Sequence, residues 1–230
     1  MVLLESSLSV ATGFLTAVGL GTWLPIQSFA GRVLAGLLLA PLSLILLNII
    51  APVPLSSLST LILAVSVVGW LRLVSTSEIG DWFPALLNPA FVLPVLFVIG
   101  LIITGDVRYQ SFEWDEFASW LNWTKELYLN DSLTESDMIW RQLGYPQAWP
   151  MALAIPQLNF ATFDPMRSLA VGVLWHAAVL GLVYEVVTRY LTNIKWASPQ
   201  VIVLAGHALI FVLLAAEIFR KIVPQDFLIE

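Results

Sequence analysis

The sequence contains no cysteine, only two histidines and few charged residues. Without cysteine the chain can form no disulfide, no thiolate metal site and no cysteine nucleophile. Charged residues make up 11% of the chain, whereas a soluble domain carries about 25%. The net charge of −6 is concentrated in one segment, and the chain has no basic patch of the kind that binds nucleic acid. The composition therefore argues against a soluble fold and against a nucleic-acid partner.

Several catalytic motifs are missing as well. The sequence has no glycine-rich nucleotide-binding loop, no G-x-S-x-G nucleophile elbow and no HExxH zinc motif. These absences argue against an ATP-driven machine, a serine hydrolase and a zinc protease. They are compatible with a substrate that is already activated when it reaches the protein.

Long apolar runs dominate the chain, and 59% of its residues are hydrophobic. A run of about 20 apolar residues spans a bilayer, and its backbone must be helical because lipid offers no hydrogen bonds. The sequence therefore predicts an all-α, polytopic transmembrane helix bundle of about six or seven spans. Pro150 and Pro156 make the fifth run a broken span or a re-entrant piece. The predicted helices are 8–28, 33–51, 57–75, 87–104, 148–162, 168–190 and 199–219.

The apolar runs divide the chain into three parts. We expect N-terminal transmembrane helices over 1–104, an aromatic and acidic external loop over 105–148, and C-terminal transmembrane helices over 149–230. The N-terminus lacks the basic start of a signal peptide, so we expect a retained first helix. The last apolar run lies close to the C-terminus, and truncation of a longer protein is one interpretation. Lysine and arginine divide evenly between the two sides, so they do not predict the orientation.

The loop is long for a connection, and it is rich in aromatic residues. Loops of this length are usually functional or disordered, and disordered segments contain few aromatics. We therefore expect an ordered, functional loop. Five of the ten tryptophans lie in it or at its edge: Trp114, Trp120, Trp123, Trp140 and Trp149.

Within the loop, 113–129 is predicted to form an amphipathic helix along the membrane surface. Asp115 and Glu116 would lie in its first turn, where the helix dipole stabilises carboxylates. One interpretation is a plain interfacial helix. The other makes one of these acids a general base or a ligand for Mg²⁺ or Mn²⁺. The predicted apolar stripe consists of Phe117, Trp120, Leu121, Thr124, Leu127 and Tyr128.

Three short motifs occur in an order that resembles the GT-C class of integral membrane glycosyltransferases, in particular protein mannosyltransferases and aminoarabinose transferases. An Asp-Glu pair opens the external loop in that class, and here it is Asp115-Glu116. A Tyr-Pro-Pro-like motif follows at Tyr145-Pro146-Gln147, and an Arg-Leu-Pro-like helix start at Arg167-Ser168-Leu169. The resemblance covers about 106–192. The chain departs from the pattern in three ways. Gln147 stands where a second proline is usual, Ser168-Leu169 lacks the usual proline, and about four predicted spans precede the loop instead of one.

The resemblance implies a polyprenyl-phosphate sugar donor, inversion at the anomeric carbon, and a glycan, lipid or protein acceptor in the cell envelope. It also implies a bacterial inner membrane with the loop on its outer face. Asp115 would be the first candidate for general base or metal ligand, and Glu116 the second. Lys125 and Arg141 would neutralise the lipid phosphate. Trp114, Trp120 and Tyr145 would stack on the sugar or line the lipid tail, although interfacial anchoring explains each of them equally well.

Two other functions fit the composition. A transporter or flippase for a lipid or sugar would use ionisable groups inside the spans, and His176, Glu185 and His207 are the candidates. A non-catalytic membrane subunit would bind a partner through the tryptophan-rich loop, with Trp120 and Trp123 as anchors.

Overall fold

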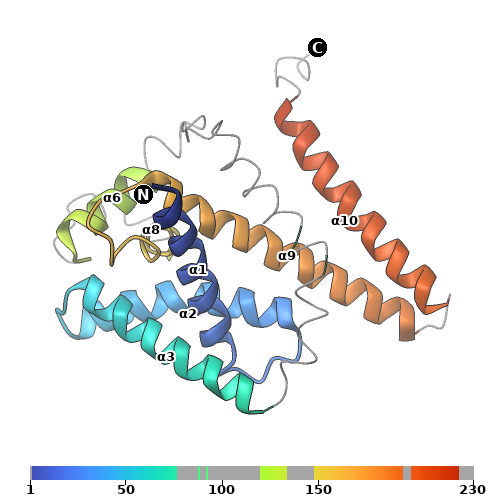
Figure 1. Ribbon diagram of the computed structural model, residues 1–230, viewed down its shortest axis with the longest axis horizontal. Helices are drawn as coiled ribbons and strands as arrows, with labels where there is room; N and C mark the ends of the chain where they lie inside the picture. The colour runs from blue at the N-terminus through green and yellow to red at the C-terminus, as the bar shows by residue number, and fades with distance from the viewer. Residues whose placement is uncertain are drawn as a thin grey trace.

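The computed structural model describes residues 2–76, 88, 92, 120–133, 148–193 and 198–222. Over these ranges the chain forms seven helices and no strand, which confirms the all-α prediction (Figure 1). The helices are α1 (Val2–Gly21), α2 (Phe29–Ile50), α3 (Leu55–Ser75), α6 (Leu121–Asn130), α8 (Ala148–Ala154), α9 (Pro165–Asn193) and α10 (Pro199–Ile222).

Serine and proline mark the helix starts. The Ser28 hydroxyl caps α2 by accepting a 2.8 Å hydrogen bond from the Gly31 amide. Pro165 and Pro199 are the first residues of α9 and α10, where proline fits because the first amides of a helix have no partner within it. Pro54 precedes α3 and offers no capping side chain. The start of α3 therefore needs acceptors from elsewhere in the molecule.

Helix α1 is the centre of the N-terminal bundle, packed between α2 and α3 at glycine contacts. A Cβ atom on Gly36 of α2 would lie 1.7 Å from the carbonyl oxygen of Ala17, and one on Gly19 would lie 2.2 Å from that of Ser66. The backbones therefore touch directly at both crossings. Small residues at helix crossings are typical of membrane bundles, where apolar burial does not drive helices together.

Two of the described helices, α2 and α3, are long and apolar enough to cross a membrane. The core helix of a soluble protein can have the same length and composition, but it is mostly buried. Here only 39% of the most apolar stretch of α2 and 33% of that of α3 are buried. The predicted span at 87–104 lies outside the described residues except for Asn88 and Val92, so the predicted total of spans stays a prediction.

The run at 148–162 is interrupted, as predicted. It forms the seven-residue helix α8 and then turns through 155–160 toward the start of α9. Seven helical residues rise only about 10 Å, roughly a third of the hydrocarbon thickness of a bilayer. The broken span and the re-entrant piece both stay predictions. Residues Pro150 to Leu158 are buried, because α8 lies against α2, α6 and α9.

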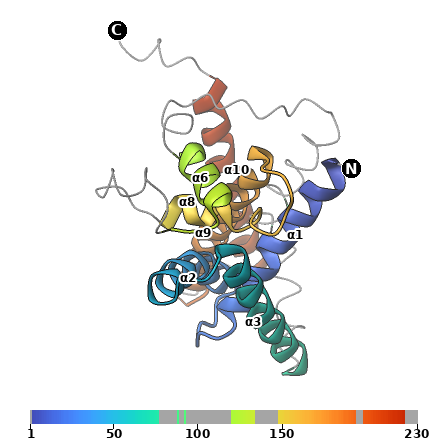
Figure 2. The ribbon, with the colours of Figure 1, turned by 90° about the vertical axis from the view of Figure 1, so that its left-hand side faces the viewer.

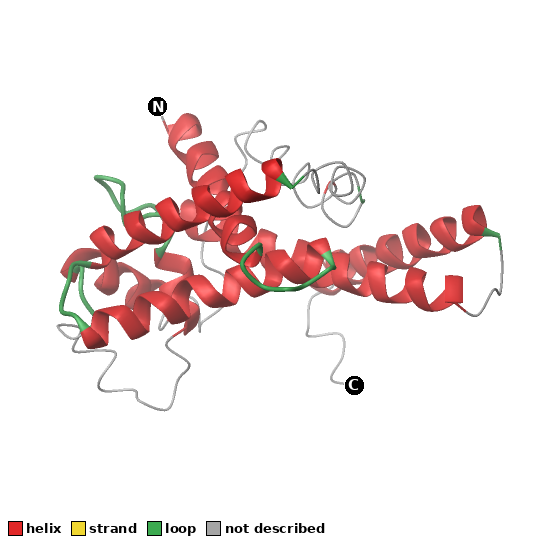
Figure 3. Ribbon diagram, turned by 90° about the horizontal axis from the view of Figure 1, so that it is seen from below, coloured by secondary structure: helices red, strands yellow, loops and turns green. Residues whose placement is uncertain are grey.

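Helix α10 lies along α9 on the side away from α1–α3 (Figures 1 and 3). The contact is close at Gly206, where a Cβ atom would lie 2.6 Å from the ring of Tyr184. Helix α10 exposes several large apolar side chains: Val201, Val203, Leu204, Val212 and Leu213.

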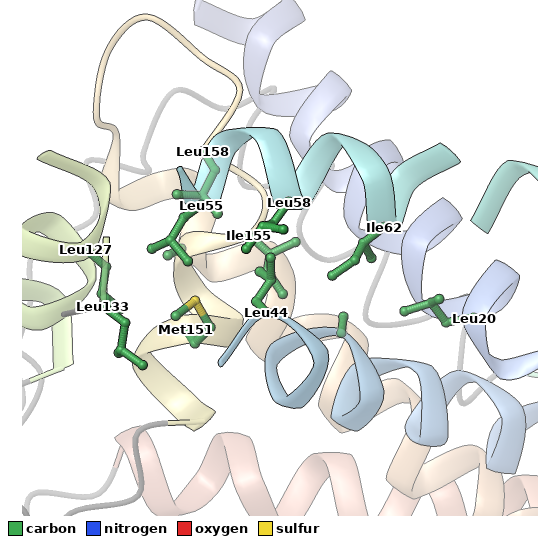
Figure 4. Packing of buried hydrophobic residues seen from close by; sticks show 12 residues of the cluster. Leu20, Leu44, Leu55, Leu58, Ile62, Leu127, Leu133, Met151, Ile155 and Leu158 are labelled. Atoms are coloured by element: carbon green, nitrogen blue, oxygen red, sulfur yellow. The ribbon is translucent and has the colours of Figure 1, made fainter. Parts of the chain in front are cut away.

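One buried apolar cluster joins the loop to the bundle (Figure 4). Leu127 of α6 and Leu133 just after it belong to the same cluster as Met151 of α8, Leu44 of α2 and Leu55 of α3. We call this region the loop end: the C-terminus of α2, the N-terminus of α3, 120–133, α8 and the start of α9. Figure 2 looks onto it, with α6 in front.

Candidate functional site at the loop end

Helix α6 has an amphipathic character, as predicted, but its buried face is rotated from the predicted stripe. Its fully buried residues are Trp123, Thr124 and Leu127, whereas Tyr128 is only partly buried. The Thr124 hydroxyl lies 2.7 Å from the Trp120 carbonyl and 3.3 Å from the Pro150 carbonyl of α8. Protein therefore covers the apolar face of α6, and the partners on both sides decide which residues are buried. The first half of the predicted helix, 113–119, lies outside the described residues.

Two of the predicted substrate-binding residues lie on α6 or at its start. Trp120 is partly buried, meets Trp123 edge to face at 5.4 Å between ring centroids, and packs against Ala152 and Leu153. Its ring thus contributes to packing, whatever else it binds. Lys125 is exposed, which leaves its ammonium group accessible to an anion. The other predicted site residues, Trp114, Asp115, Glu116, Arg141 and Tyr145, lie outside the part of the chain that the structure describes.

The segment after α6 is attached to the turn between α2 and α3. Both carboxylate oxygens of Asp131 accept hydrogen bonds from Ser56, one from its amide at 2.7 Å and one from its hydroxyl at 2.6 Å. The Asp131 carbonyl accepts a third bond, from the Leu55 amide at 2.9 Å. A second attachment runs through Asn48, whose side chain accepts from the Leu133 amide at 3.0 Å. The loop therefore supplies the acceptors that Pro54 does not.

A buried glutamine organises the turn between α8 and α9. Gln157 is fully buried, and its amide nitrogen donates to the Ser168 hydroxyl at 2.7 Å and to the Leu153 carbonyl at 3.3 Å. Its side-chain oxygen accepts from the Asp164 amide at 3.0 Å. Buried polar groups are normally bonded in this way. Gln157 thus fixes the end of α8 against the start of α9.

Next to this turn lies a buried arginine. Arg167 is only 2% exposed, its guanidinium carbon lies 4.3 Å from the centroid of the Phe160 ring, and it donates to the Thr162 carbonyl at 2.5 Å. Tyr128 of α6 reaches the same turn, since its hydroxyl donates to the Phe160 carbonyl at 2.8 Å. The described part of the loop is therefore in direct contact with the turn that leads into α9.

These contacts bring together elements that adjoin all three motifs of the sequence. In the sequence, α6 begins five residues after Glu116, and α8 begins directly after Gln147. Arg167 lies in the first turn of α9. Helix α6 carries the exposed cation Lys125, and Trp120 and Trp149 pack against one buried apolar cluster in the same region. Such an arrangement can hold an anionic headgroup at a membrane surface.

No group of three or more histidines and acids with the geometry of a metal site occurs among the described residues. The carboxylate of Asp131 is engaged by Ser56. Asp115, the predicted metal ligand, lies outside the described ranges, so the predicted Mg²⁺ or Mn²⁺ site stays a prediction.

The ionisable groups expected of a transporter have structural partners. The Glu185 carboxylate accepts a hydrogen bond from the Ala30 amide at 3.0 Å and so caps the start of α2 from α9. His176 and His207 are exposed, and the Nδ1 atom of each lies within 2.9 Å of a carbonyl one turn earlier in its own helix.

Asp131, Asn48 and Gln157 were not predicted from the sequence. Pro54 before a predicted helix was a usable signal, because it implies a cap from another segment. The sequence does not say that the segment is 75 residues away. Comparison of the chain with protein-family models, with curated proteins and with solved structures gives no match.

Proposed function

We propose that the protein is a membrane glycosyltransferase that moves a sugar from a polyprenyl-phosphate donor to a cell-envelope acceptor, with inversion. The observation that carries the proposal is the meeting of α6, α8 and the start of α9 at the loop end. Each of these elements adjoins or contains one of the three glycosyltransferase-like motifs. Motifs that are far apart in sequence but serve one reaction must be brought close together by the fold.

A bilayer location is supported by the exposed apolar surface of α2 and α3. A soluble protein rarely exposes an apolar patch of this extent. The proposed bundle has about six or seven spans, with the loop on the outer face of a bacterial inner membrane. The exposed residues include Leu38, Leu42, Leu46, Ile49 and Ile50 on α2, and Leu61, Val65, Val68, Leu71 and Val74 on α3.

The positions of Ser75, at the end of α3, and of Trp120, where the next continuous described segment begins, support the predicted topology. Helix α3 ends at Ser75, away from the loop end, and the chain is next described as a continuous segment from Trp120, at the loop end. The intervening sequence therefore leads from one end of the bundle to the other. One crossing at 87–104 would accomplish this.

In the proposed reaction an acceptor hydroxyl attacks the anomeric carbon from the face opposite the leaving group. The new carbon–oxygen bond forms as the bond to the phosphate oxygen breaks, and the polyprenyl phosphate leaves with the electron pair. Asp115 takes the hydroxyl proton, with Glu116 as the supporting acid. Lys125 and Arg141 bind the donor phosphate and neutralise its charge, and a divalent cation held by Asp115 would stabilise the phosphate as it departs.

The test is a transfer assay on the purified chain in lipid, with radiolabelled polyprenyl-phosphate sugars of several kinds and mixed envelope acceptors. Asp115→Asn and Glu116→Gln keep the side-chain shape and remove the charge. Glu135→Gln and Asp137→Asn remove the same charges elsewhere in the loop and serve as matched controls. We expect at least a hundredfold loss of rate in one of the first pair, normal rates in the controls, and an unchanged elution volume on size exclusion.

The two rival functions predict other results. If wild type transfers no sugar but moves the labelled donor across proteoliposomes, the protein is a transporter or flippase. If it does neither, while Trp120→Ala abolishes capture of a partner protein, the loop is a binding surface. Normal transfer by both acid variants would refute the assignment of Asp115 and Glu116.

A further inference from the structure

The start of α3 depends on a residue from the external loop. Pro54 stands at the N-cap position and makes no side-chain bond, yet the first amides of any helix need acceptors. Asp131 provides them for Leu55 and Ser56, through its carbonyl and its carboxylate. A negative charge at this place also interacts favourably with the helix dipole.

Asp131 also ends α6. It is the one described non-glycine residue with a positive φ angle, 50°. Aspartate tolerates the left-handed conformation better than most residues, and this conformation commonly terminates helices. A single residue therefore stops one helix and caps another, which fixes the distance between the two helix ends.

The apolar contacts of α6 do not define its position as closely. Trp123 and Leu127 are fully buried and hold the helix against the bundle. Apolar burial is non-directional, so a helix can slide or turn by a fraction of a turn and keep most of it. The bonds from Ser56 to Asp131, at 2.7 and 2.6 Å, have strict directions and lengths. They define the position of the C-terminal end of α6 against the start of α3, as the bond from Tyr128 to Phe160 defines it against the turn before α9.

We propose that Asp131 is a positioning residue, whose contact with Ser56 aligns α6 so that Lys125 faces the phosphate of the lipid-linked donor. The part of this proposal that concerns the donor rests on the proposed function. Asp131 itself touches no substrate. Asn48 gives the same segment a second attachment, so that loss of Asp131 misplaces α6 without releasing it from the bundle.

The kinetic consequence differs from that of simple destabilisation. Lys125 would bind the donor phosphate in the ground state and the transition state alike, and loss of such uniform binding raises KM and leaves kcat unchanged. We expect Asp131→Ala to raise the KM for the donor at least tenfold and to change kcat less than threefold. A merely structural role would lower the active fraction, and with it kcat, at constant KM. Asp131→Asn keeps one acceptor and should be intermediate.

A second measurement does not depend on enzyme activity. Because the chain has no cysteine, spin labels can be placed directly at Leu129→Cys on α6 and Leu61→Cys on α3. Both residues are exposed, at 65% and 52%. We expect a single narrow distance distribution in the otherwise wild-type chain, and at least a twofold broader or a displaced one after Asp131→Ala. Val186→Ala, an exposed change on α9, serves as the control for both measurements.

The outcomes separate the two proposals. A changed distance distribution with a raised KM supports positioning. An unchanged distribution with an unchanged KM overturns it. If wild type transfers no sugar from any donor, the proposed function fails, and the distance measurement alone decides whether Asp131 positions α6. If Asp131→Ala does not fold, Ser56→Ala, which removes only the hydroxyl bond, takes its place, and an unchanged distribution there overturns the proposal.

Discussion

The crossing of α1 and α2 at Gly36, the closest at any described glycine, gives the sharpest stability prediction. In Gly36→Ala the new methyl group would lie 1.7 Å from the carbonyl oxygen of Ala17. A carbon and an oxygen at rest are about 3.5 Å apart, so α1 and α2 must separate by about 2 Å. The obstacle is backbone, which cannot rotate away as the end of a side chain can.

The expected cost follows from two opposing effects. Overpacking a well-packed core costs about 1–3 kcal/mol, and a clash with backbone belongs at the upper end. Alanine in a helix interior gains about 0.5–1 kcal/mol over glycine. The net loss is then about 2 kcal/mol, and each kcal/mol shifts the Tm of a chain of this size by about 2–4 °C. We expect the Tm of Gly36→Ala to fall by about 4–8 °C.

The assay is thermal unfolding of the purified protein in a mild detergent, followed by intrinsic tryptophan fluorescence. Gly172→Ala is the matched control, because no atom lies within 4 Å of its new methyl group. Its Tm should stay level or rise by about 2 °C. Equal Tm values for the two variants would refute the inference that α1 and α2 meet backbone to backbone at Gly36.

Other substitutions test the remaining contacts. Glu185→Leu should lower the free energy of unfolding by about 1–2 kcal/mol because the Ala30 amide loses its acceptor, while Glu185→Gln keeps one and should stay near wild type in chemical denaturation. Gln157→Leu should cost about 2–4 kcal/mol in the same assay, since it leaves the Asp164 amide and a buried hydroxyl without their bonds; a loss below 1 kcal/mol would contradict the role of Gln157. His176→Ala should change stability by less than about 0.5 kcal/mol and leave transfer intact, and a selective loss of transport in vesicles would instead favour the transporter function.

The sequence predicts the helices that are defined by length and by proline. The predicted ranges 33–51 and 57–75 correspond to α2 and α3, because an apolar run between prolines allows little else. The run at 148–162 was ambiguous for the same reason: Pro150 and Pro156 show that it is interrupted but not on which side it leaves. Only the structure shows that the helix ends at Ala154 and that it packs against α2 and α6.

The described part of the loop shows a second limit of prediction from sequence, which concerns the direction of a buried helix face. The three- and four-residue spacing of apolar residues correctly predicted an amphipathic helix at α6, and Thr124 and Leu127 are buried as predicted. The full burial of Trp123 was not predicted, because periodicity gives the width of an apolar face while the neighbouring helices determine its direction. The contact between Asp131 and Ser56 is beyond any local pattern. Asp115 and Glu116 stay predictions, since they lie outside the described residues.

The central place of α1 has a consequence for assembly during synthesis. Its close crossings are with α2 and α3, the next two helices to be made, so all three can pack once residue 75 has been inserted. Contacts between near neighbours in sequence form fast, because little chain entropy is lost in closing the connection. The attachment of Asp131 to Ser56 closes a far longer stretch and must come later. The first three helices would then pack together first, and the loop would dock onto them afterwards. A substitution at Gly36 should therefore impair the packing of α1 and α2 before the loop has been synthesised.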